Sequence, residues 1–173
     1  DGVHWRRFDE AWVRPGLHER NRAHRANTPS HGLLETGPEE MSVYLERDYT
    51  FPSNRVERMT LRPDGFVSAH AGYPGGELIT KPIIFTGSTM VLNYSTAANG
   101  SIRIEVQDEQ GRPIPGFLLE ESPLIFGDKL AEAVPWKHPQ GRTDRSPFAR
   151  LAGQAVRFRI VMRDADLYSI QFK

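Results

Sequence analysis

Adjacent pairs of acidic residues are the first candidates for chemistry in this sequence, such as Asp9-Glu10, Glu39-Glu40 and Glu120-Glu121. Cleavage of a glycosidic bond needs two carboxyl groups about 5 to 10 Å apart across a cleft, one acting as the acid and the other as nucleophile or base. Neighbouring residues on a strand point to opposite faces, so an adjacent pair does not provide that arrangement. We therefore interpret each pair as ordinary surface charge.

The histidines are the second candidates, and there are six of them. None shows the spacing of a metal-ligand set, so we expect no zinc site. His70 and Tyr73 lie in the glycine-rich stretch AHAGYPGG, where the backbone could approach a ligand, and we treat both as candidates for carbohydrate binding. The alternative is that both side chains pack at the junction between two regions of the chain.

Trp136 and three aspartates complete the set of candidate site residues. Trp136 stands in a loop-like context between Pro135 and Lys137 and could offer a ring face to a sugar. The alternative is that it covers a hydrophobic core. A structural calcium ion is the one possible cofactor. Its candidate ligands are Asp128, which follows a glycine, and the pair Asp164 and Asp166. Turn formation explains the spacing of that pair equally well.

Composition excludes several classes of function. The chain has 173 residues, no cysteine, and 22 basic against 22 acidic side chains. A net charge of zero removes the long-range attraction that a nucleic-acid binder uses, so we expect no nucleic-acid partner. No apolar run approaches the roughly 20 residues that span a bilayer, so we expect a soluble chain without membrane insertion. Signature motifs of serine hydrolases, nucleotide-binding loops and zinc proteases are absent from the sequence.

Short alternating runs of apolar residues, separated by Gly, Pro, Asn and Asp, predict an all-β chain. A hairpin is expected from residues 32–36 and 42–47. A second is expected from residues 57–62 and 66–71, with its turn at Pro63-Asp64-Gly65. Further strands are expected at 89–95, 101–108, 155–163 and 167–172, with turns at Asn99-Gly100 and Asp164-Ala165-Asp166.

The strand spacing indicates two regions. Residues 55–173 are predicted to form an antiparallel β-sandwich of jelly-roll type, with a core that includes Leu92, Ile104, Phe158 and Ile170. Residues 1–54 are too short and too polar to make their own core. They include a long loop, residues 14–31, whose excess of arginine could face a carboxylate or phosphate or could simply be solvated. The chain opens on Asp-Gly, a turn dipeptide, so we expect it to be a fragment of a longer one.

Several segments together resemble a known family. They are DGVHW, RPGL, RPDGFVSAHAGYPGGELITKP, LNYSTAANGSIRIEVQDEQGRPIPGF and LAGQAVRFRIVMRDADLYSIQF. The chain resembles the C-terminal region of a group of bacterial predicted glycoside hydrolases, in which a five-bladed β-propeller is followed by a jelly-roll β-sandwich. DGVHW looks like the end of a repeated propeller-blade motif.

This resemblance implies that residues 1–54 are the remnant of the last blade, and that the catalytic carboxylates lie upstream of the chain. No catalytic residue is therefore assigned. The expected function is structural support of an upstream propeller domain, with carbohydrate contact, in an extracellular or periplasmic protein. Two alternatives stay open. One is an autonomous hydrolase with Asp9, Glu35 and His70 in a cleft, and the other is an independent carbohydrate-binding module.

Overall fold

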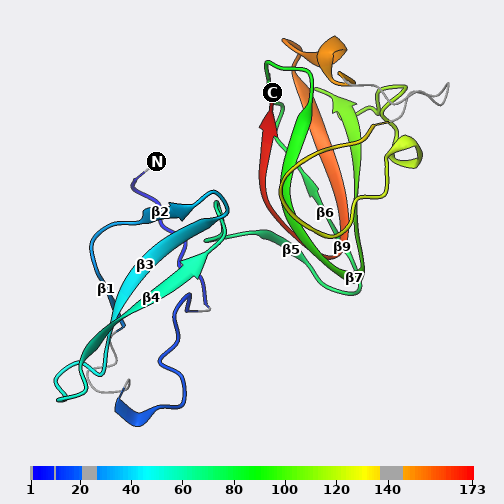
Figure 1. Cartoon of the computed structure of the whole chain (residues 1–173). Coiled ribbons are helices and arrows are strands. Elements are labelled where there is room, and N and C mark those ends of the chain that lie inside the picture. The colour runs from blue at the N-terminus through cyan, green and yellow to red at the C-terminus, as the bar shows by residue number, and fades with distance from the viewer. Residues whose placement is uncertain (1, 10, 21–26, 137–145) are drawn as a thin grey trace. The chain divides into compact units, whose positions relative to one another are not determined.

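The computed structural model describes residues 2–9, 11–20, 27–136 and 146–173. The chain divides into two compact units, Asp1–Phe66 and Val67–Lys173 (Figure 1). The sequence pattern predicted the boundary between residues 54 and 55, before the strand at 55–61. The structure places that strand in the first unit, because all of its hydrogen bonds within the sheet go to a strand of that unit.

The first unit is a small antiparallel sheet of four strands, β1 (Thr28–Pro29), β2 (Leu34–Gly37), β3 (Glu40–Arg47) and β4 (Arg55–Leu61). β3 is the central strand, with β4 along one edge and β2 and β1 along the other. The predicted hairpin over residues 32–47 is confirmed as β2 and β3. The buried apolar residues of this unit are Val43 and Leu45, as expected for a region without a sizeable core.

The predicted hairpin at 57–62 and 66–71 is wrong. The turn itself forms, since the amide of Gly65 donates to the carbonyl of Arg62 and Asp64 has a φ of 58°. The strands on its two sides, however, take different partners. β4 pairs with β3, whereas β5 (Ala69–Ala71) pairs with the last strand of the second unit.

The second unit is built on two long strands, β7 (Met90–Asp108) and β9 (Val156–Phe172), which pair with each other along almost their whole length. β8 (Asp128–Ala133) extends the sheet beside β7, while β5 and β6 (Gly76–Ile79) lie beside β9. Two short 3-10 helices, Leu119–Glu121 and Ala149–Leu151, lie in the connections. None of the helices in the described part of the chain is long and apolar enough to cross a membrane.

Both long strands reverse direction midway without leaving the sheet. Phe158 and Phe172 are 14 residues apart in the sequence, and a straight strand would separate them by about 46 Å. Their ring centroids are 5.4 Å apart, so β9 folds back on itself. β7 bends with it, because the register passes from Thr96 opposite Ala165 to Ser101 opposite Arg163. Figure 1 shows both strands making this bend side by side.

The bend turns one hydrogen-bonded sheet into two facing layers. One layer contains the first half of β7 and the second half of β9, and the other contains the remaining halves. Strands that change layer through an irregular corner are typical of packed β-sheets. The predicted all-β antiparallel class is therefore confirmed, and the two layers are consistent with the predicted sandwich. The jelly-roll connectivity stays a prediction.

The core of the second unit fills the space between these layers. Leu92, Ile104 and Phe158, all predicted as core, are at most 1% exposed, and Ile170 packs against them. Aromatic rings from connections and strands meet there, with centroid separations of 3.9 to 6.4 Å, and they come from Phe85, Phe117, Trp136, Phe148, Phe158 and Phe172. The residues of this core cluster all come from the second unit.

Candidate functional site

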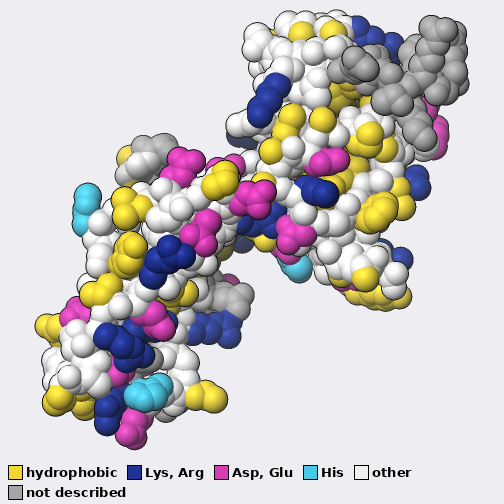
Figure 2. Space-filling model, viewed as in Figure 1, with side chains coloured by type: hydrophobic (Ala, Val, Ile, Leu, Met, Phe, Trp, Pro, Cys, Tyr) yellow, Lys and Arg dark blue, Asp and Glu magenta, His cyan; other side chains and the backbone are white. Residues whose placement is uncertain are grey.

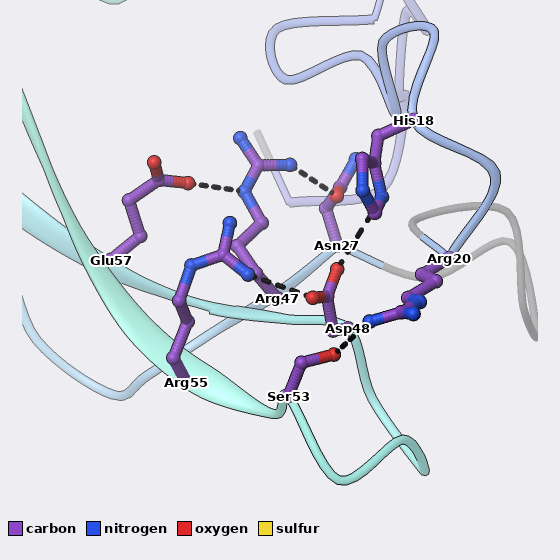
Figure 3. Close-up of polar contacts among 8 residues, drawn as sticks. All are labelled: His18, Arg20, Asn27, Arg47, Asp48, Ser53, Arg55 and Glu57. Atoms are coloured by element: carbon purple, nitrogen blue, oxygen red, sulfur yellow. Dashed lines mark hydrogen bonds and ion pairs between the residues drawn. The ribbon is translucent and has the colours of Figure 1, made fainter.

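A polar cluster at the end of β3 joins the long N-terminal loop to the first sheet (Figure 3). Asp48, at its centre, is 3% exposed and has a φ of 54°, in the left-handed region. The Arg55 guanidinium donates to Asp48 Oδ2 at 2.8 Å, and His18 Nδ1 lies 3.8 Å from Oδ1. We call this group the Asp48 cluster, and its members are His18, Arg20, Asn27, Arg47, Asp48, Ser53, Arg55 and Glu57.

The remaining contacts of the Asp48 cluster fix the position of the loop at two more points. Arg47 donates to the carboxylate of Glu57 and to the side-chain oxygen of Asn27, both at 2.7 Å. Arg20 donates to the hydroxyl of Ser53 at 2.9 Å. The loop arginines could have faced an acidic group or been solvated. Arg20 contacts a hydroxyl, while Arg22 and Arg25 lie outside the described residues.

Electrostatics favour the ionised form of Asp48. A hydrogen bond from the Ser53 side chain lowers the pKa of Asp48, and the charge of Arg55 lowers it further, against an opposing effect of desolvation. Asp48 therefore provides a fixed negative charge between cationic side chains. The Asp48 cluster therefore serves to position the loop. The Asp48 carboxylate already accepts a hydrogen bond from Arg55.

His70 lies in the second unit and makes a contact that sequence spacing did not reveal. Its Nδ1 is 2.9 Å from Asp166 Oδ1, and the Ser68 hydroxyl donates to the same oxygen at 2.6 Å. The pairing of β5 with β9 sets this contact by placing His70 opposite Asp166. Ser68 donates its proton to the aspartate and not to the histidine, so this trio is not an activated serine nucleophile.

Tyr73 lies beside an open groove on the outer face of the second unit. Its ring is 69% exposed, and the Arg163 guanidinium lies over it, 4.3 Å from the ring centroid. The groove has a volume of about 530 Å³. Its walls come from the β5–β6 connection, β6, β7 and β9, and the residues are Pro74, Gly75, Gly76, Glu77, Ser101, Arg103, Val161, Met162 and Arg163.

Alternation along the strands explains why charged groups line this groove. Ile102, Ile104 and Met162 are buried in the core, so Arg103 and Val161 point to the outer face. Alternation along the strand is enough to place Arg103 on the outer face, but it does not show that Arg163 and Glu77 lie beside it. That proximity arises only from the pairing of β6 and β7 with β9.

Trp136 belongs to the core. Its side chain is 2% exposed, its Nε1 donates to the carbonyl of Gly116 at 3.0 Å, and its ring lies 5.2 Å from that of Phe117. A sugar platform needs an exposed ring face, and this ring offers none. The structure therefore corrects the assignment of Trp136 as a carbohydrate-binding residue and supports the alternative, in which it covers the core.

The three aspartates considered for calcium are placed separately. Asp166 is engaged by Ser68 and His70, Asp164 lies at the bend of β9 with a φ of 43°, and Asp128 begins β8. Within the described residues, no three His, Asp or Glu side chains gather in a way that would hold a metal ion. Bound calcium stays a prediction.

Comparison of the chain with protein-family models, with curated proteins and with solved structures finds no match.

Proposed function

We propose that this chain is a non-catalytic, supporting part of a glycoside hydrolase that docks on a propeller domain of the same parent chain and contributes carbohydrate contacts. The observation that carries this proposal is the apolar surface of the first unit. Val3, Trp5, Phe8 and Leu17 are 61% to 94% exposed, while the same unit buries only two apolar side chains among its described residues. Figure 2 shows hydrophobic side chains at the surface of this unit, and apolar side chains that gather at a surface are typical of an interaction site.

Two cavities in the second unit support a non-catalytic role. The groove beside Tyr73 has one carboxylate in its lining, Glu77, which accepts a hydrogen bond from Arg159 at 2.8 Å. A smaller cavity of about 150 Å³ also has a single carboxylate, Glu132. A glycosidase needs two carboxyl groups across its cleft. Among the residues that the structure describes, neither of these two cavities supplies that pair.

The groove also supports the carbohydrate contact in this proposal. Val161 and Pro74 provide apolar surface, and Ser101, Arg103 and Arg163 provide hydrogen-bond donors around it. Sugars have an apolar face of C–H groups and an edge of hydroxyls, and their binding sites combine the same two kinds of surface. His70 and Tyr73 lie close to this region through their contacts with β9 residues.

An independent carbohydrate-binding module is the second candidate. The observation in its favour is that the second unit has a complete core of its own. The autonomous hydrolase, with Asp9, Glu35 and His70 in a cleft, also stays a prediction. Asp9 and Glu35 belong to the first unit, and His70 belongs to the second.

Association with the upstream region tests the docking proposal. The parent gene should encode blade-like repeats before Asp1, and that region, expressed separately, should bind the chain. Trp5→Ser should abolish this binding, because Trp5 is 86% exposed in the apolar surface of the first unit. Ile84→Ser is the matched control, since Ile84 is 71% exposed but lies in the second unit.

Two results would contradict the proposal. One is a gene that starts at the beginning of this sequence. The other is sugar release from aryl glycosides by the isolated chain that Glu35→Gln abolishes, which would favour the autonomous hydrolase.

A further inference from the structure

Two arginines in the groove beside Tyr73 have positions suited to an acidic ligand. Arg103 lies opposite Val161, and Arg163 lies opposite Ser101, so the two are diagonal neighbours on the same face of the sheet. In an antiparallel pair, diagonal side chains are about 7 to 8 Å apart, within the reach of two long side chains toward a common ligand. Both arginines are exposed.

Among the residues that the structure describes, the carboxylates near the groove pair with other groups than Arg103 and Arg163. Glu77, the acidic residue in the lining, pairs with Arg159, which also lies 3.6 Å from the buried Glu105. The Arg163 guanidinium rests on the ring of Tyr73 instead of on a carboxylate. The groove therefore presents two like charges side by side, and an anion between them would relieve their repulsion.

The rest of the lining selects a sugar over a simple anion. Val161 and Pro74 offer apolar contacts, and the Ser101 hydroxyl can donate or accept a hydrogen bond. A volume of about 530 Å³ lies within the range of roughly 300 to 1,000 Å³ found for small-molecule sites. Planar guanidinium groups bind carboxylates through two parallel hydrogen bonds, which fixes the orientation of the ligand.

We propose that this groove binds an oligosaccharide that carries a carboxylate, with Arg103 and Arg163 holding the carboxylate and Val161 and Pro74 supporting the sugar ring. The inference rests on the carbohydrate contact in the proposed function and adds the class of sugar.

Titration of the whole chain with a galacturonate pentamer tests this inference, with a neutral glucose pentamer and a sulfated glucose oligomer as comparisons. The galacturonate should bind at least ten-fold more tightly than the neutral sugar. Arg103→Gln and Arg163→Gln should each weaken galacturonate binding about ten-fold or more, which is the loss expected for one charge-assisted contact. Arg112→Gln is the control, because it removes the same charge from a turn outside the groove, where Arg112 is 76% exposed and pairs with Asp108.

The outcomes separate the inference from the proposed function. Equal binding of the charged and neutral sugars, unaffected by Arg103→Gln, would overturn the acidic-sugar inference but leave the carbohydrate contact standing. Binding of no sugar would overturn both. Tighter binding of the sulfated oligomer than of galacturonate would reject the carboxylate as the recognised group. Thermal melting shows whether each variant is folded. Ser101→Ala changes the groove without changing its charge, and so gives a second test of the binding site.

Discussion

Replacement of Trp136 by phenylalanine separates a core residue from a sugar platform. Phenylalanine keeps much of the contact with Phe117 and Phe148 but removes the hydrogen bond from Nε1 to the carbonyl of Gly116. That bond contributes about 0.5 to 1.5 kcal/mol. Complete truncation of a buried tryptophan costs about 3 to 5 kcal/mol, so the smaller loss of ring atoms here adds about 1 kcal/mol. We expect the second unit to lose about 2 kcal/mol of unfolding free energy.

Urea unfolding followed by far-ultraviolet circular dichroism measures this loss. With a denaturant dependence of about 1 to 3 kcal/mol per molar urea, the midpoint of the second unit should fall by about 1 M. Trp5→Phe is the control and should leave that midpoint unchanged, because Trp5 is 86% exposed and lies in the first unit. An unchanged midpoint for Trp136→Phe, together with weaker retention on an insoluble polysaccharide, would refute the assignment of Trp136 to the core.

Two further predictions concern the bend of the second unit and the Asp48 cluster. Gly100→Ala should destabilise the second unit by roughly 1 to 3 kcal/mol in thermal melting, because the added methyl group would overlap the carbonyl oxygen of Asp164, whereas Gly72→Ala has space and should melt like the parent. A tolerated Gly100→Ala would mean that the bend is looser than described. The pKa of Asp48, measured by carboxyl NMR titration, should lie below its ordinary value of 3.8, and Ser53→Ala should raise it. Because the pKa of Asp48 is lowered in the folded state, its contribution to stability is present at pH values above the ordinary pKa. This contribution is lost as the pH falls through the lowered pKa. An unshifted pKa would contradict the hydrogen bond from Ser53.

Sequence patterns identified the strands more reliably than their partners. The alternation in residues 101–108 placed Ile102 and Ile104 inward, and both are 0% exposed. Asn99-Gly100 and the segment from Asp164 were expected to close separate hairpins. The reversal at these positions is confirmed, but the two segments face each other within β7 and β9 and form one corner. An Asn-Gly hairpin turn uses positive φ at both residues, whereas neither Asn99 nor Gly100 has a positive φ in the corner, so the dipeptide signals a change of direction without specifying its type.

The candidate site shows the same limit. His70 was chosen for the glycine-rich stretch around it, and its contact with Asp166 depends on a pairing between residues 96 positions apart. Arg103 and Arg163 carried no local signal, because exposed arginines on a strand are ordinary. Trp136 was a candidate for a sugar platform because its flanking proline and lysine suggest a loop, whereas the rings that cover it come from distant segments.

The pairing of β7 with β9 also has a consequence for the rate at which the second unit folds. Met90 pairs with Phe172, so the longest ladder of the second unit joins residues from its two ends and needs a long loop to close first. The first unit is different, because β2, β3 and β4 follow one another along the chain and pair with their neighbours. Topologies dominated by distant contacts fold slowly. We therefore expect the second unit to fold more slowly than the first, with its apolar strands exposed to aggregation for longer while the core assembles.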